Sequence, residues 1–133
     1  MAKKTVALAL GSGGARGYAH IGLIDELERR GYNIVAVSGS SMGAIVGGFY
    51  CAGKLEQLRE WVCGLSYLDV LRLVDLSLLS SGAVRGDRVF RQLGEMLEGQ
   101  QIEDMALPFT AVATDLTRKK EVWFQRGDLN HAI

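Results

Sequence analysis

Residues 33–44 read NIVAVSGSSMGA, an apolar run followed by serines between glycines and then by the start of a second apolar run. Residues 33–37, a short apolar run rich in β-branched side chains, predict a buried strand, and the run that begins at Ala44 predicts a helix. The serines therefore lie at a strand-to-helix turn. Strands that alternate with helices indicate an α/β fold.

Ser41 is the serine of this stretch that has a glycine two positions before it and two positions after it. Gly39, Ser41 and Gly43 thus form the G-x-S-x-G pattern of a nucleophile elbow. Such a sharp turn projects the serine hydroxyl outward only if the residues beside the serine have no side chains that collide with the strand or the helix. Glycines at positions 39 and 43 meet this requirement. The alternative is a glycine-tolerant turn in which Ser40 or Ser41 caps the following helix.

Further apolar runs extend the α/β pattern along the chain. We expect strands at residues 6–10, 33–37, 107–114 and 121–125, the last two as a hairpin, and helices at residues 19–30, 41–52 and 55–62. Residues 77–86 are rich in serine and glycine and predict a mobile loop. Residues 65–79 are amphipathic, and they predict either a core-facing helix or a lid that contacts lipid.

The composition indicates one soluble globular domain, with 133 residues, 48% hydrophobic and 23% charged. Fifteen basic residues balance fifteen acidic ones, and the largest cationic cluster, residues 118–120, predicts a solvated turn. We therefore expect no nucleic-acid partner. Cys51 and Cys63 lack the spacing of a metal or redox site and predict reduced core thiols.

The N-terminus predicts a cytoplasmic protein. Lys3 and Lys4 precede an apolar run that stops at Gly11, too short for a typical signal peptide, so we expect a first buried strand instead. No stretch reaches the length of a membrane-spanning helix, and any membrane contact is expected to be peripheral.

A glycine-rich loop, residues 11–17 with the sequence GSGGARG, follows the first predicted strand. A dinucleotide-binding G-x-G-x-x-G pattern fails at Arg16, and residues 35–38 lack the acidic residue that such a site needs. Successive unobstructed backbone N–H groups at the start of a helix instead suit a developing oxyanion. The loop therefore predicts an oxyanion-binding partner for Ser41.

The two motifs together, GSGGARGYAHIGLIDEL at residues 11–27 and GSSMGA at residues 39–44, resemble the patatin-like phospholipases in their bacterial form. PFTAVATDL at residues 108–116 and GDL at residues 127–129 extend the resemblance over essentially the whole chain. It implies a three-layer α/β fold with a parallel sheet, and hydrolysis of lipid esters or phospholipids without a metal or an organic cofactor.

Carried onto this sequence, the resemblance makes Ser41 the nucleophile and the backbone amides of Gly13 and Gly14 the oxyanion hole. Gly11, Arg16 and Gly17 would support the loop. Ser12 departs from a common all-glycine pattern, which matters little if a backbone amide does the work.

The base of this family is an aspartate of an Asp-Gly-Gly or Asp-Gly-Ala motif, and no aspartate of this sequence precedes a glycine. We therefore expect residues 1–133 to be the N-terminal part of a single patatin-like domain, with the base beyond Ile133. Alone, these residues should be nearly inactive and prone to self-association through an exposed sheet edge.

Other interpretations stay open. Asp115, at the end of a predicted strand, is the best substitute base or else a turn residue. Ser41, Asp115 and His131 would follow the chain order of an α/β-hydrolase triad, whereas His20 is expected to pack or to form a hydrogen bond. A regulatory or interaction module without catalysis is the competing class.

Overall fold

The structure, a computed structural model, describes residues 4–66, 68–69 and 83–133, with the backbone alone for residues 83–88. Its sheet contains β1 (Thr5–Leu10), β2 (Asn33–Gly39), β3 (Phe109–Asp115) and β4 (Lys120–Phe124), in that spatial order. β1 and β2 are parallel, as are β2 and β3, while β3 and β4 form an antiparallel hairpin. The predicted α/β class with a mainly parallel sheet is confirmed.

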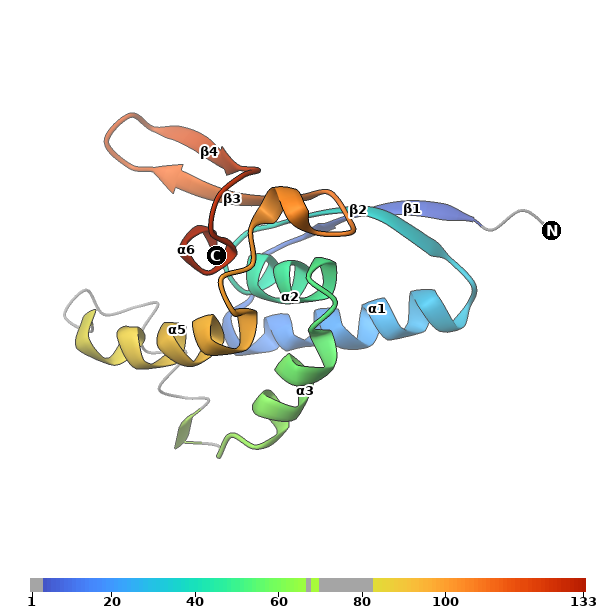
Figure 1. Cartoon of the computed structure of the whole chain (residues 1–133), viewed down its shortest axis with the longest axis horizontal. Helices are drawn as coiled ribbons and strands as arrows, with labels where there is room; N and C mark the ends of the chain where they lie inside the picture. Colours follow the sequence, from blue (N-terminus) through green and yellow to red (C-terminus); the bar gives the residue numbers. More distant parts are fainter. Residues whose placement is uncertain (1–3, 67, 70–82) are drawn as a thin grey trace.

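The helices of the described residues gather on one side of this sheet (Figure 1). They are α1 (Ala19–Arg29), α2 (Met42–Cys51), α3 (Leu55–Cys63), α5 (Ala83–Leu97) and the short α6 (Leu129–Ala132), with 3₁₀ turns η1 (Gly14–Tyr18) and η2 (Ile102–Asp104). The helix α2 packs directly on β1, β2 and β3. It lies between the sheet and the helices α3 and α5, whereas α1 also contacts β2.

The sequence of α2 suits this central position because it is apolar on all sides. Val46 and Phe49 are completely buried. A Cβ atom added to Gly47 would lie 2.8 Å from a methyl carbon of Val37 on β2, so the glycine allows the helix backbone to approach the strand closely. The prediction of a buried, closely packed second helix is confirmed.

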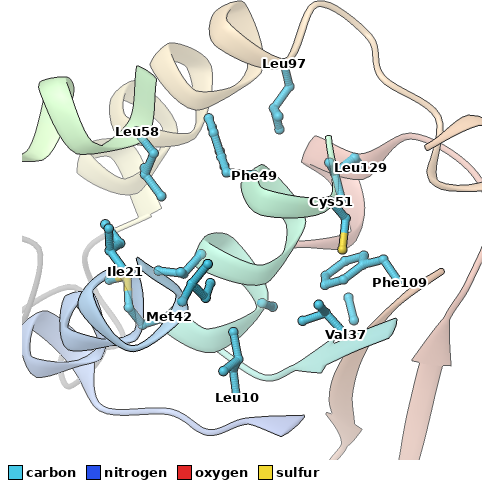
Figure 2. Close-up of a cluster of buried hydrophobic side chains, with 14 of the residues drawn as sticks. Leu10, Ile21, Val37, Met42, Phe49, Cys51, Leu58, Leu97, Phe109 and Leu129 are labelled. Carbon is cyan, nitrogen blue, oxygen red and sulfur yellow. The ribbon is translucent and has the colours of Figure 1, made fainter. Parts of the chain in front are cut away.

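The core extends on both sides of α2. Figure 2 shows the side chain of Phe49 between Leu58 of α3 and Leu97 of α5. Val37 and Phe109 lie on the opposite side of α2 and come from the sheet. One apolar cluster thus joins the strands, α2 and the outer helices.

Two predictions from the sequence were wrong. Residues 83–86, expected in a mobile loop, form the first turn of α5, whose glycines obscured a helix that Leu93 and Leu97 anchor in the core. Cys63, expected in the core, is exposed at the end of α3, while Cys51 is buried as expected. The remainder of the predicted loop and most of the amphipathic stretch 65–79 lie outside the described residues.

Replacing Phe49 by alanine should lower the free energy of unfolding by about 3–5 kcal/mol, because it leaves a cavity between three elements. Leu23 of α1, which is 46% exposed, offers a matched control, and Leu23→Ala should cost about 0.5 kcal/mol. Denaturant titration of both variants measures the difference. Equal costs would contradict the assignment of α2 as the centre of the core.

Candidate functional site

The glycine loop and the elbow, residues 39–43, lie side by side because of strand register. Leu10 and Gly39 are the last paired residues of β1 and β2. The backbone N–H of Ser40 then donates a hydrogen bond of 3.1 Å to the carbonyl oxygen of Leu10. Both segments therefore leave the sheet at the edge where parallel strands end, here called the carboxyl edge, where ligands bind in open α/β sheets.

The backbone of Ser41 is strained. Its φ is 53° and its ψ is −126°, whereas Glu98 and Lys119, the other non-glycine residues with positive φ, occupy turns at the ends of elements. A left-handed helical residue has a ψ near +47°, so Ser41 lies outside even that tolerated region. Strain of this kind concentrates at functional sites and persists only where the surroundings enforce it.

The Ser41 side chain is exposed and does not cap α2, although Ser41 is the N-cap residue by position. The carbonyl oxygen of Ser41 accepts hydrogen bonds from Ala44 and Ile45, which starts the helix through the backbone alone. The hydroxyl of Ser40 instead lies 3.3 Å from that of Ser12. The alternative in which either serine acts as a side-chain cap is thus wrong.

Glycines make the tight elbow sterically feasible. A Cβ atom on Gly39 would collide with the carbonyl group of Gly43, and one on Gly43 would collide with the carbonyl oxygen of Leu10. Gly17 is similarly constrained, because a Cβ atom there would collide with the side chain of Met42. These close contacts clamp Ser41 between the end of β1, the glycine loop and α2.

The glycine loop presents backbone N–H groups close to the elbow. Within the described part of the chain, the N–H of Gly13 donates to no acceptor. Gly14 starts the 3₁₀ turn η1, and the first N–H groups of a helix have no partner inside it. Gly14 also has a φ of +54°, a conformation that glycine adopts without the strain of a side chain.

Two side-chain hydrogen bonds whose partners the sequence did not indicate hold the loop in place. The Nε2 atom of His20 lies 2.9 Å from the carbonyl oxygen of Gly11, so His20 donates this bond from the tautomer with hydrogen on Nε2. The hydroxyls of Ser12 and Ser40 join the loop to the elbow. His20 forms a hydrogen bond as expected, but no sequence signal shows its partner, since both pairs arise from the fold.

The carboxylate of Asp115 is committed to a turn. It accepts hydrogen bonds of 3.0 Å from the backbone N–H groups of Thr117 and Arg118, which agrees with the interpretation as a turn residue. His131 is exposed on α6, where its backbone N–H donates to Asp128. Among the residues that the structure describes, none forms a hydrogen bond with the Ser41 hydroxyl.

The remaining loop residue, Arg16, is exposed on η1. Two positions further along, burial raises the pKa of the Tyr18 phenol, which keeps this side chain neutral.

A separate groove of about 530 Å³ is lined by residues of β1, β2 and the segment before β3, including Ala36, Ser38 and Pro108. Its lining includes neither Ser41 nor the glycine loop. We therefore do not assign this groove to the substrate of Ser41.

Comparison with protein families and curated proteins adds independent information. The family model described as patatin-like phospholipase matches residues 8–131. An uncharacterised NTE family protein of Mycobacterium tuberculosis is 51% identical over 128 residues, which are 96% of this chain and 36% of that protein. Human patatin-like phospholipase domain-containing protein 6 is 36% identical over 119 residues, which are 85% of this chain and 8% of that protein.

Similarity also extends to neuropathy target esterase sws of Drosophila persimilis, which is 31% identical over 118 residues. The chain spans 36% of the length of the mycobacterial relative and 8% of the length of the fly protein. In the described part of the chain, no helix has both the length and the apolar character needed to cross a membrane.

Replacing Gly43 by alanine should destabilise the protein by about 1–3 kcal/mol or more, because the new methyl group meets a backbone carbonyl that cannot rotate away. Gly22 in α1 is the matched control, since a Cβ atom there meets nothing within 4 Å. Gly22→Ala should stabilise by about 0.5–1 kcal/mol. Thermal unfolding of both variants distinguishes the two effects, and a stable Gly43→Ala protein would refute the proposed clamp.

Proposed function

Because this chain belongs to the patatin-like phospholipase family, we propose that it carries the nucleophile half of a serine hydrolase that cleaves ester bonds in lipids. The observation that carries the proposal is the backbone of Ser41, with its φ of 53° and ψ of −126° and its exposed side chain. A turn that served only to connect a strand to a helix would not require this strain.

In the proposed reaction, the Ser41 oxygen attacks the carbonyl carbon of a lipid ester. The hydroxyl proton passes to a base, and the negative charge that develops on the carbonyl oxygen is stabilised by the N–H groups of Gly13 and Gly14. Collapse of this intermediate expels the alcohol, which takes a proton, and leaves an acyl group on Ser41. Water then attacks the acyl-enzyme, which releases the fatty acid and restores the serine.

The loop needs rigidity for this role, because preorganised donors need not reorient when charge develops. The hydrogen bonds from His20 to Gly11 and between Ser12 and Ser40 supply that rigidity from two sides. Gly39 and Gly43 allow the elbow to approach the loop, and Gly17 gives Met42 room to pack. The exposed Arg16 can meet the substrate or solvent without disturbing the loop.

The base of the proposed Ser–Asp dyad is an aspartate outside these 133 residues, since no aspartate in the sequence carries the Asp-Gly motif. Accordingly, we regard the chain as the N-terminal part of one patatin-like domain. The turn hydrogen bonds of Asp115 disfavour it as a substitute base and also weaken the Ser41, Asp115 and His131 triad. Among the residues that the structure describes, no contact specifically favours a purely regulatory module.

A fluorophosphonate probe should label Ser41 in the natural protein, and Ser41→Ala should abolish that labelling. Ser38→Ala is a matched control that removes a nearby hydroxyl, and it should retain labelling because Ser38 lines the separate groove, which includes neither Ser41 nor the glycine loop. Mass spectrometry of the labelled peptide identifies the modified serine. Labelling that survives Ser41→Ala would overturn the assignment of the nucleophile.

Gly14→Val should lower esterase turnover in the natural protein by about 10²-fold or more, as losses of oxyanion donors do. The substitution forces a β-branched residue into a φ of +54° and places its side chain beside the approaching carbonyl. Gly11→Ala is the control, because Gly11 has open space and no positive φ. Turnover with a soluble short-chain ester provides the measurement, and near-normal turnover of folded Gly14→Val would exclude the oxyanion role.

A further inference from the structure

The β3–β4 hairpin extends beyond the carboxyl edge of the sheet. Only residues 109–111 of β3 pair with β2, where the last pair is Ala111 with Gly39. Residues 112–115 continue, paired with β4 alone, and at about 3.3 Å per residue they reach roughly 13 Å past the end of β2. In Figure 1 the hairpin turn projects free of the helices. It therefore overhangs the edge that carries Ser41.

The hairpin turn, residues 116–120, combines an apolar side chain with cations. Leu116 is 83% exposed, the most exposed of the large hydrophobic residues in the described part of the chain. Arg118, Lys119 and Lys120 follow it and are all exposed. Two carboxylates flank this turn, Asp115 and Glu121. Asp115 is only partly accessible: its Oδ1 accepts both turn hydrogen bonds, and its Oδ2 lies 3.8 Å from the guanidinium of Arg118.

The geometry of the turn is fixed by a side-chain carboxylate and by the backbone conformation. Asp115 accepts hydrogen bonds from the N–H groups of Thr117 and Arg118, and Lys119 adopts a left-handed conformation with a φ of 52°. These interactions hold Leu116 outward without a covering partner among the described residues. A leucine alone at a surface is common, but Leu116 lies beside three cations, so this turn presents an apolar side chain and positive charge together.

We propose that this hairpin turn docks the carboxyl edge onto an anionic lipid surface. Leu116 enters the boundary between headgroups and acyl chains, and Arg118, Lys119 and Lys120 bind lipid phosphates, with the lysine stems lying along the apolar layer. A nucleic acid would pair with the cations but would leave Leu116 in water. The inference rests on the proposed function, since docking brings Ser41 toward ester bonds in the same surface.

Binding is tested separately from hydrolysis. The natural protein should cosediment with phosphatidylcholine vesicles that contain phosphatidylglycerol, and less with phosphatidylcholine alone. Lys119→Glu should weaken binding to the anionic vesicles about fivefold or more, the loss expected for one cation near such a surface. Leu116→Ser should weaken binding to both kinds of vesicle.

Lys4→Glu is the matched control. Lys4 lies over the ring of Tyr32 at the amino end of β1, whereas the hairpin extends from the carboxyl edge of the sheet. It should bind like the natural protein. Circular dichroism melting confirms that each variant is folded, and fluorophosphonate labelling of Ser41 should be unchanged in all three variants. If the probe failed to label Ser41 in the natural protein, the proposed hydrolase function would be refuted. The docking proposal is tested by vesicle binding alone.

Anionic-vesicle binding that is the same for Lys119→Glu, Leu116→Ser and the natural protein would overturn the proposal. The proposal would also be overturned if the natural protein did not bind anionic vesicles. It would be overturned as well if Lys4→Glu weakened binding to these vesicles as much as Lys119→Glu does. Loss of binding confined to the hairpin variants supports it.

Discussion

The site depends on the contact between the backbone of α2 and the end of β1. Gly43 lies so close to the carbonyl oxygen of Leu10 that any side chain there would collide with it. This approach draws the start of α2 under the glycine loop and forces the chain to turn within residues 39–43. The strained backbone of Ser41 is the consequence, and an elbow at greater distance could relax.

The strain at Ser41 is sustained by burial elsewhere. A residue in an unfavourable backbone conformation costs about 1–3 kcal/mol, and it persists because α2 buries Val46 and Phe49 completely against the sheet and the outer helices. Each of these side chains contributes an apolar term of about 1.5–3 kcal/mol on burial. The core thus stabilises the geometry of Ser41 through α2, the wholly apolar helix that begins directly after the serine.

Local sequence patterns predicted much of this arrangement. The alternation of short apolar runs with helical patterns identified β1, β2, α1, α2, α3 and the β3–β4 hairpin within about two residues, because each has a strong period or clear boundary glycines. The G-x-S-x-G spacing identified Ser41 as the candidate, and the structure adds the strain and exposure that the spacing implies.

Features set by contacts distant in sequence could not be predicted in this way. The hydrogen bond between Ser12 and Ser40 joins residues that meet only because Leu10 pairs with Gly39. Helix α5 was missed because Gly94 lowers helix propensity. In the fold this glycine leaves room for the side chain of Asn130, whose amide nitrogen would lie 2.7 Å from a Cβ atom placed there. Strand register and side-chain packing thus determine which glycines break a helix and which accommodate a neighbour. A linear sequence pattern contains neither the register nor the packing.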